Sequence, residues 1–191
     1  MTYPLSGNWR AGKAFDLHTL SSVYIGDNEF GHPQFDNNYS EMGKLVHQLK
    51  YDNDREAIGR IIELLNNVGG IENFDFVIPA PSSNIRPQQP VDLIAEALGA
   101  RRGVTVLSGF LKKVSGGTQL KNVDDPAERE KLLKDAIKIV GTQNIAGKAV
   151  LLVDDLYRSG ATLNACSAIL QEHAGAADVC VLTMTKTRSK R

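Results

Sequence analysis

The chain has 191 residues, with 22 Lys and Arg against 22 Asp and Glu, and 42% of its residues are hydrophobic. A formal net charge of zero excludes a global positive field that would draw the protein to nucleic acid or anionic lipid. No run approaches the roughly 18 apolar residues of a membrane span, and the first residues lack the apolar region of a signal peptide. We therefore expect a cytoplasmic protein of one compact domain, whose core needs neither a disulfide nor a structural metal.

Cysteine and histidine spacing supports this expectation. Cys166 and Cys180 stand among apolar residues in no C-x-x-C or Cys/His arrangement, which predicts two buried thiols. The histidines show no metal or triad spacing either, and we expect them to fill surface or core positions; they are His18, His32, His47 and His173.

The first part of the chain predicts irregular structure followed by two helices. Up to about Asn38 the sequence is rich in Gly, Asn, Asp and Pro, which predicts turns and a hairpin that includes residues 22–25. A helical period begins next, with apolar residues at i, i+3, i+4 and i+7: Met42, Leu45, Val46 and Leu49. A second helix is predicted to start after Asp54 as its N-cap and to end at Gly69–Gly70.

After residue 70 the pattern alternates between strands and helices. Apolar runs predict buried strands over residues 74–78, 104–107, 149–153 and 179–184. Helices are predicted over residues 90–98 with Gly99 as the stop, from Asp125 after a long loop over 111–122, and over 162–174.

This alternation predicts an α/β fold with a parallel sheet of four or five strands and helices on both faces. We expect residues 71–191 to form this α/β core and residues 1–70 to form a small N-terminal hood or lid with the amphipathic helices. Ligands of such folds bind beyond the carboxyl ends of the strands. The chemistry is therefore expected where a predicted strand ends.

The most informative segment is VLLVDDLYRSGAT, residues 150–162, in which an apolar run leads to two acids, a short turn and a helix. The turn supplies successive backbone N–H groups at a helix N-terminus, and Gly160 allows a ligand to approach closely. The hydroxyls of Ser159 and Thr162 complete a cradle that suits a phosphate dianion.

Asp154 and Asp155 would repel an anion, so they do not suit the phosphate itself. Adjacent carboxylates suit the vicinal hydroxyls of a ribose and a hydrated Mg²⁺ nearby. The segment therefore predicts a ribose 5-phosphate site. Two alternatives remain open: a solvated strand end followed by an ordinary capped turn, and an unrelated α/β hydrolase or phosphatase with Asp154 as nucleophile or metal ligand.

Residues 150–162 resemble the phosphoribosyl pyrophosphate (PRPP) signature of type I phosphoribosyltransferases. The wider pattern, over roughly residues 22 to 185, is similar to the ComF branch of that family. The positions that carry this similarity are Leu49-Lys50-Tyr51, Val77-Ile-Pro-Ala-Pro81, Gln119, Arg129 and Gly147-Lys148.

The resemblance implies a role for particular residues. Asp154 and Asp155 would hold the ribose hydroxyls and Mg²⁺. The 5-phosphate would be held by Arg158, Ser159, Gly160, Ala161 and Thr162. The turn over residues 79–83 would meet the pyrophosphate through Pro81, Ser82 and Ser83. A mobile loop over residues 112–129 would close over the substrate, and the cations that neutralise the departing pyrophosphate would be Lys112, Lys113, Lys121 and Arg129.

The activity implied is that of a pentosyl glycosyltransferase of nucleotide metabolism, which moves the phosphoribosyl group of PRPP to an unidentified nitrogen acceptor with Mg²⁺ and releases pyrophosphate. The alternative is a non-catalytic protein that binds PRPP or a nucleotide and serves regulation or DNA uptake.

The chain departs from the family in two ways. It lacks the N-terminal cysteine zinc module common in the ComF branch, and Arg158 stands where several purine enzymes carry an acid. The expected partner is a small molecule, without membrane or nucleic acid, and a homodimer is left open.

Overall fold

A six-stranded sheet forms the centre of the protein, in the order β1-β2-β10-β9-β5-β6. The computed structural model describes residues 2–52, 54–82, 86, 88–114 and 134–188. The strands of the sheet are β1 (Tyr3–Pro4), β2 (Ala11–Leu17), β5 (Phe76–Pro79), β6 (Thr105–Val106), β9 (Ala149–Tyr157) and β10 (Asp178–Lys186). Neighbours pair in parallel except β1, which is antiparallel to β2. The predicted parallel sheet is confirmed, with six strands where four or five were expected.

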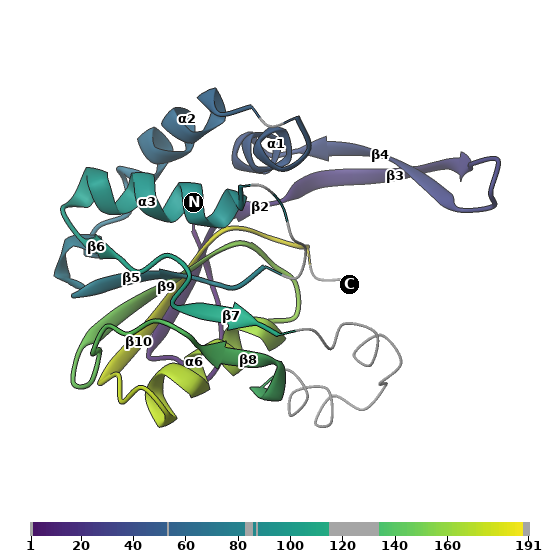
Figure 1. The fold of residues 1–191 in the computed structure, drawn as a ribbon. Coiled ribbons are helices and arrows are strands. Elements are labelled where there is room, and N and C mark those ends of the chain that lie inside the picture. Colours follow the sequence, from purple (N-terminus) through teal and green to yellow (C-terminus); the bar gives the residue numbers. More distant parts are fainter. Residues whose placement is uncertain (1, 53, 83–85, 87, 115–133, 189–191) are drawn as a thin grey trace.

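Helices cover both faces of this sheet, as predicted (Figure 1). One face carries α1 (Glu41–His47), α2 (Glu56–Leu65) and α3 (Pro90–Arg102), with a π-helical turn η1 (Gln48–Asp52) after α1 and a 3₁₀ turn η2 (Ile71–Asn73) after α2. The other face carries α6 (Ala161–Glu172) and a ribbon of β7 (Leu111–Lys113) and β8 (Ile137–Ile139). A separate hairpin, β3 (Thr19–Asp27) and β4 (Pro33–Tyr39), projects from the body. Among the described residues, the helices are too short or too polar to cross a bilayer.

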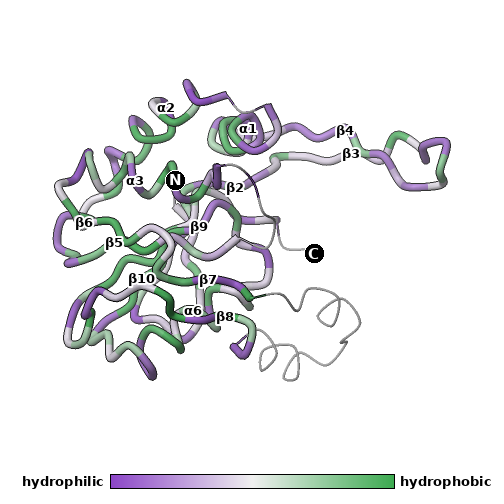
Figure 2. Tube along the Cα trace, viewed as in Figure 1, coloured by the Kyte–Doolittle hydropathy of each residue, from purple (hydrophilic) through white to green (hydrophobic). Residues whose placement is uncertain are grey.

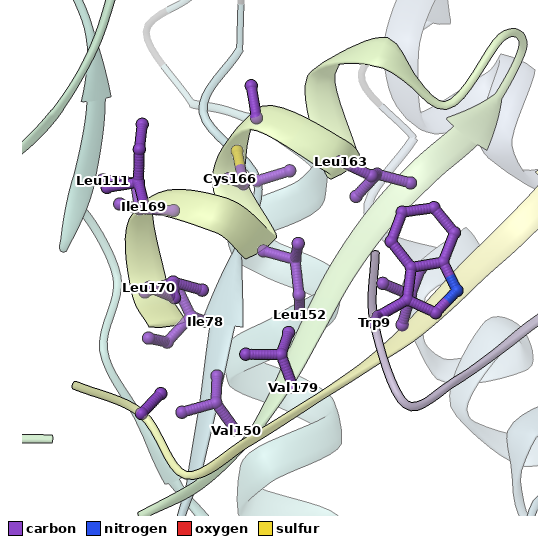
Figure 3. Packing of buried hydrophobic residues seen from close by; sticks show 14 of the residues in the cluster. Trp9, Ile78, Leu111, Val150, Leu152, Leu163, Cys166, Ile169, Leu170 and Val179 are labelled. Carbon is purple, nitrogen blue, oxygen red and sulfur yellow. The ribbon is translucent and has the colours of Figure 1, made fainter. Parts of the chain in front are cut away.

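Strand β9 shows why the sequence predicted its core segment correctly. Val150 and Leu152 pack with Trp9 and the residues of α6, as Figure 3 shows, whereas Leu151 and Val153 join the cluster beneath α1, α2 and α3. A strand that is covered on both faces is apolar at every position, so it appears as a continuous run. The two cysteines belong to these clusters and are free and buried, as predicted.

Helix α3 does not stop at Gly99, which corrects the prediction. It continues to Arg102, and Gly103 ends it with a left-handed φ of 69°. Gly99 is required for packing instead, because a Cβ there would lie 2.1 Å from the Cγ2 atom of Val106 on β6. The extra turn lets Arg102 donate hydrogen bonds of 2.9, 3.0 and 2.9 Å to carbonyl oxygens at the end of α2, those of Leu65, Asn66 and Val68.

The first 17 residues contribute the strands β1 and β2 to the central sheet, where the sequence predicted turns. Strand β2 pairs with β10 from Ala11 opposite Cys180 to Leu17 opposite Lys186, so it extends the central sheet. Its sequence did not reveal a strand because most of its residues are only partly buried near the sheet's edge. The expected hairpin is present and is longer than residues 22–25. The division of the chain at residue 70 stays a prediction.

The segment after residue 110 differs from the predicted loop at its beginning. Leu111–Lys113 is a strand, because Leu111 is buried and pairs with Ile139 of β8 across the α6 side of the sheet. The rest of the predicted loop, and the start of the helix predicted at Asp125, lie outside the described residues.

Candidate functional site

The candidate site lies where β5 and β9 end side by side. Pro79 is opposite Val153, and the N–H of Ala80 donates a 2.8 Å hydrogen bond to the carbonyl oxygen of Val153. Because the two strands are parallel, the turn after β5 meets the acids of β9 at the same edge of the sheet. A pocket of about 300 Å³ opens at this edge.

Six of the predicted site residues line this pocket: Pro81, Ser82, Asp154, Asp155, Arg158 and Thr162. Residues 159–161 connect two of these lining residues. Lys112 lies on β7 and is not among the lining residues, so the described structure does not bring it to the acids. The predicted positions Ser83, Lys121 and Arg129 lie outside the described residues.

The turn before α6 has the geometry of an anion cradle. Gly160 takes a left-handed conformation, with φ 78° and ψ −3°, and it has no side chain to cap the helix. A Cβ at this position would lie 2.7 Å from the hydroxyl oxygen of Tyr157. Glycine is therefore required here twice, by the backbone angle and by the Tyr157 ring. The first N–H groups of α6 point away from the helix body toward this edge, as they do at any helix N-terminus.

A second helix begins at the same pocket. Gln89, Pro90 and Val91, the cap and first turn of α3, contribute to its wall. The positive ends of two helices of 13 and 12 residues therefore face one cavity. Sequence analysis identified only the α6 end, although Pro90 at the first helical position marked the start of α3.

Asp154 lines the pocket, and a backbone hydrogen bond holds its carboxyl group. Its Oδ1 atom accepts a 2.8 Å hydrogen bond from the N–H of Asp155. Burial of the carboxyl group, and then the neighbouring charge of Asp155, raise the pKa of Asp154 from 3.8 to about 7. At neutral pH this carboxyl group is therefore poised between its protonated and charged forms.

Asp155 is already paired. Its Oδ2 atom lies 2.8 Å from the Nζ atom of Lys50, and the two side chains are only 14% and 19% exposed. Its carbonyl oxygen accepts a 3.0 Å hydrogen bond from the hydroxyl of Thr185 on β10. Lys50 comes from η1, more than a hundred residues earlier. Sequence analysis gave Lys50 no role beyond the family pattern Leu49-Lys50-Tyr51, which was the only signal of its importance.

A series of rings leads from the base of the hairpin to the pocket. Ring centroids are separated by 5.4 Å from His18 to Tyr39, 5.1 Å from Tyr39 to His47, and 4.7 Å from His47 to Tyr51. Tyr51 lines the pocket with its side chain largely exposed. Burial, and then the charge of Lys50, lower the pKa of His18. Sequence analysis treated these histidines as fillers, although His47 and Tyr51 are four residues apart on one helical segment.

The residues present fit Mg²⁺ only as part of a substrate complex. Among the described residues, no cluster of three or more His, Cys, Asp or Glu could hold a metal ion. Two adjacent carboxylates are available, and one of them already has an ion pair with Lys50. Mg²⁺ commonly binds to one or two carboxylates together with phosphate oxygens of a substrate, and this donor set suits that mode.

No protein-family model matches the sequence, and no curated protein matches it significantly. Among solved structures, the chain is similar to an adenine phosphoribosyltransferase from Thermoanaerobacter pseudethanolicus, with 17% identity, coverage of 86% of this chain and 95% of the other, and a TM-score of 0.48. The purine phosphoribosyltransferase from Pyrococcus horikoshii shows 16% identity, coverages of 69% and 81%, and a TM-score of 0.42. The adenine phosphoribosyltransferase from Saccharomyces cerevisiae shows 14% identity, coverage of 86% of this chain and 84% of the other, and a TM-score of 0.44. At these identities and TM-scores the similarities assign neither a family nor an activity to the chain.

Proposed function

We propose that the protein binds PRPP with Mg²⁺ in this pocket and transfers the phosphoribosyl group to a nitrogen acceptor. The observation that carries the proposal is the meeting of two carboxylates and the N-terminus of α6, whose N-cap residue is glycine, in one pocket. The α6 end, with Arg158 and Thr162, suits the 5-phosphate, because N–H groups, a hydroxyl and a guanidinium all favour an anion. Asp154 and Asp155 suit the ribose hydroxyls, because carboxylates accept hydrogen bonds.

The other side of the pocket suits the pyrophosphate. The start of α3, the turn at Pro81 and Ser82, and Arg86 are among the residues that line the pocket. A helix N-terminus and an arginine both stabilise phosphate oxygens. Two separate anion sites beside the acid pair match a ribose that carries a 5-phosphate at one end and a pyrophosphate at the anomeric carbon.

Lys50 would adapt the acid pair to this ligand. By pairing with Asp155 it offsets one of two adjacent negative charges, which otherwise face a ligand with several phosphate charges. Asp154 and Asp155 would hold Mg²⁺ together with substrate oxygens, and the ion would neutralise charge on the departing pyrophosphate. Asp154 must be charged for this role.

The reaction would be a displacement at the anomeric carbon. The bond to a pyrophosphate oxygen breaks as the bond to the acceptor nitrogen forms, and positive charge develops on the ribose. The carboxylates stabilise that charge, whereas Arg86 and the start of α3 stabilise the leaving group. Catalysis by this chain would consist mainly of positioning and electrostatics.

Tyr51 supports a planar acceptor. Its exposed ring stands at the rim of the pocket next to Lys50, and a flat aromatic face suits stacking with a heterocyclic base. Lys50 and Tyr51 both belong to the segment that resembles the ComF branch, and assignment of the chain to that branch is part of the proposal. Arg158 gives no support to an acceptor contact through a carboxylate at that position.

Calorimetry with separate ligands tests the division of roles. We expect wild-type protein to bind PRPP in the presence of Mg²⁺, and a variant with Asp154→Asn and Asp155→Asn to lose about tenfold to a hundredfold in PRPP affinity while keeping its affinity for inorganic phosphate. Thr162→Ala should weaken both ligands, because its hydroxyl would donate a hydrogen bond to the phosphate group that both ligands share. Asp178→Asn, at the opposite end of β10, is the matched control and should change neither affinity.

Two results would count against the proposal. Absence of PRPP binding at millimolar ligand would remove it, and equal losses for both ligands in both variants would contradict the separate roles of acids and turn. Pyrophosphate release, measured with a panel of bases and amines, then separates the transferase from the non-catalytic alternative. Binding without release would favour a protein that senses PRPP or a nucleotide.

A further inference from the structure

The hairpin β3–β4 exposes apolar side chains on both of its faces. Tyr24 and Phe35 are paired in register, with ring centroids 5.7 Å apart, and are 55% and 50% exposed. Val23 alternates with Tyr24 along the strand and so faces the other way; it is 60% exposed, and Ile25 is 62% exposed. Figure 2 shows apolar stretches along this projecting arm.

An arm of this kind is not stable by its own contacts. A two-stranded hairpin in water is marginal at best, and contiguous exposed apolar surface marks an interaction site. The arm also has a charge preference, since residues 19–40 contain three acids and no Lys or Arg; the acids are Asp27, Glu29 and Asp36. Its partner surface should therefore be apolar and basic.

The β7–β8 ribbon on the opposite side of the sheet has this chemistry. Lys112 and Lys138 are paired in register and exposed, and among the described residues neither has a carboxylate within ion-pair distance. Val114 and Val140, at the ends of the same ribbon, are 42% and 51% exposed. By strand alternation, Val114 shares the outer face of Lys112. The ribbon therefore offers two exposed cations with apolar neighbours.

We propose that the chain forms a two-fold symmetric dimer in which the hairpin of each copy docks on the β7–β8 ribbon of the other. The hairpin projects from the side of the sheet that carries α1, whereas the ribbon lies on the side that carries α6 (Figure 1). In such a dimer the arm of one copy contacts the ribbon of the other, and two-fold symmetry makes the same contact form twice.

Two further observations favour a second copy over another partner. The matching surface is present on this chain itself, and its charge is opposite to that of the arm. In a two-fold dimer both arms and both ribbons are occupied, so assembly stops at the dimer and leaves no apolar arm exposed. The inference does not depend on the proposed function, because neither the hairpin nor the outer face of the ribbon lines the pocket.

Sedimentation equilibrium of the full chain at micromolar concentration tests the dimer. We expect wild-type protein to be dimeric, and we expect two variants to be monomers with unchanged circular dichroism: Val23→Glu with Ile25→Glu on the arm, and Lys112→Glu with Lys138→Glu on the ribbon. The matched control is Lys13→Glu with Lys44→Glu, which makes the same charge change at exposed positions elsewhere and should remain dimeric.

Charge reversal on both surfaces identifies the contact. Asp27→Lys, Glu29→Lys and Asp36→Lys should also give a monomer, and their combination with Lys112→Glu and Lys138→Glu in one chain should restore the dimer. A photo-cross-linking residue in place of Tyr24, in a mixture of isotope-labelled and unlabelled protein, should join the arm to peptides of β7 or β8 from the other copy.

Several outcomes would overturn the inference. These are a wild-type monomer at every concentration, dimers whose cross-links join arm to arm, and loss of the dimer in the control variant. Binding of the wild-type arm to phosphatidylcholine vesicles, abolished by Val23→Glu with Ile25→Glu while sedimentation shows only monomers, would assign the arm to a lipid surface instead.

Discussion

Asp154 faces two opposing demands. Burial beside Asp155 raises its pKa to about 7, whereas the proposed contact with ribose and Mg²⁺ requires the charged form. Between the ordinary pKa of 3.8 and the raised value, the folded protein holds a proton that the unfolded chain has lost. The free energy of unfolding contributed by this group therefore falls as the pH rises from about 4 to about 7.

Asp154→Asn tests this linkage, because the amide cannot ionise. At pH 8 we expect its free energy of unfolding to exceed that of the wild type by about 1 to 3 kcal/mol, and at pH 4 the two should be nearly equal. Urea denaturation at both pH values measures the difference. The lowered pKa of His18 contributes to the free energy of unfolding with the opposite sign, because that contribution is lost as the pH falls. His18 is present in both proteins, so its contribution cancels in the difference between them. A difference that is the same at both pH values would contradict the linkage.

Helix α6 depends on Gly160 for its start. The residue combines a φ of 78° with a contact to Tyr157, whereas Gly103 at the end of α3 has a φ of 69° and, among the described residues, no neighbour within 4 Å of where a Cβ would lie. Comparing alanine substitutions at Gly160 and Gly103 separates the free-energy cost of the left-handed backbone angle from the cost of the clash with Tyr157. The comparison also distinguishes a turn beside the pocket from a turn remote from it.

We expect Gly103→Ala to lower the free energy of unfolding by about 1 kcal/mol, which is the cost of a left-handed alanine. Gly160→Ala should lower it further, because Tyr157 must also move, and should weaken inorganic phosphate binding, which Gly103→Ala should not change. Urea denaturation and calorimetry measure the two effects. Equal losses of stability, or unchanged phosphate affinity in Gly160→Ala, would show that the turn does not have the assigned role.

The whole molecule is organised around one sheet that serves two hydrophobic clusters. Trp9 belongs to the cluster on the α6 side, whereas Leu182 of β10 is buried on the opposite side, beneath α1, α2 and α3. Because β9 and β10 contribute to both clusters, neither layer can unfold while leaving the other intact. Unfolding should therefore be a single cooperative transition.

Leu182→Ala tests this coupling. We expect it to lower the free energy of unfolding by about 2 to 5 kcal/mol through loss of buried contacts. The transition followed by Trp9 fluorescence should shift by the same amount as that followed by far-UV circular dichroism, although Trp9 lies on the other face. A Trp9 transition that stays at its wild-type midpoint would mean that the two layers unfold separately.

Local patterns account for the parts of the fold that were predicted. The strands over residues 149–153 and 179–184 are buried on both faces, so their runs are continuous and their ends were placed within a few residues. Strand β2 lies next to the edge strand β1 and is only partly buried, and its mixed sequence predicted turns. Gly99 was predicted to end the helix because the neighbouring sequence does not distinguish a glycine that ends a helix from one that leaves room for the side chain of Val106.

The order of acids, turn and helix over residues 154–162 is a property of consecutive residues, so the sequence by itself determined the α/β class and the position of the candidate site. Only the tertiary structure decided that Lys50 neutralises Asp155, that α3 begins at the same pocket, and that Lys112 lies elsewhere. These relations join segments far apart in the chain. They depend on how helices and strands pack across the sheet, and residue spacing does not encode that packing.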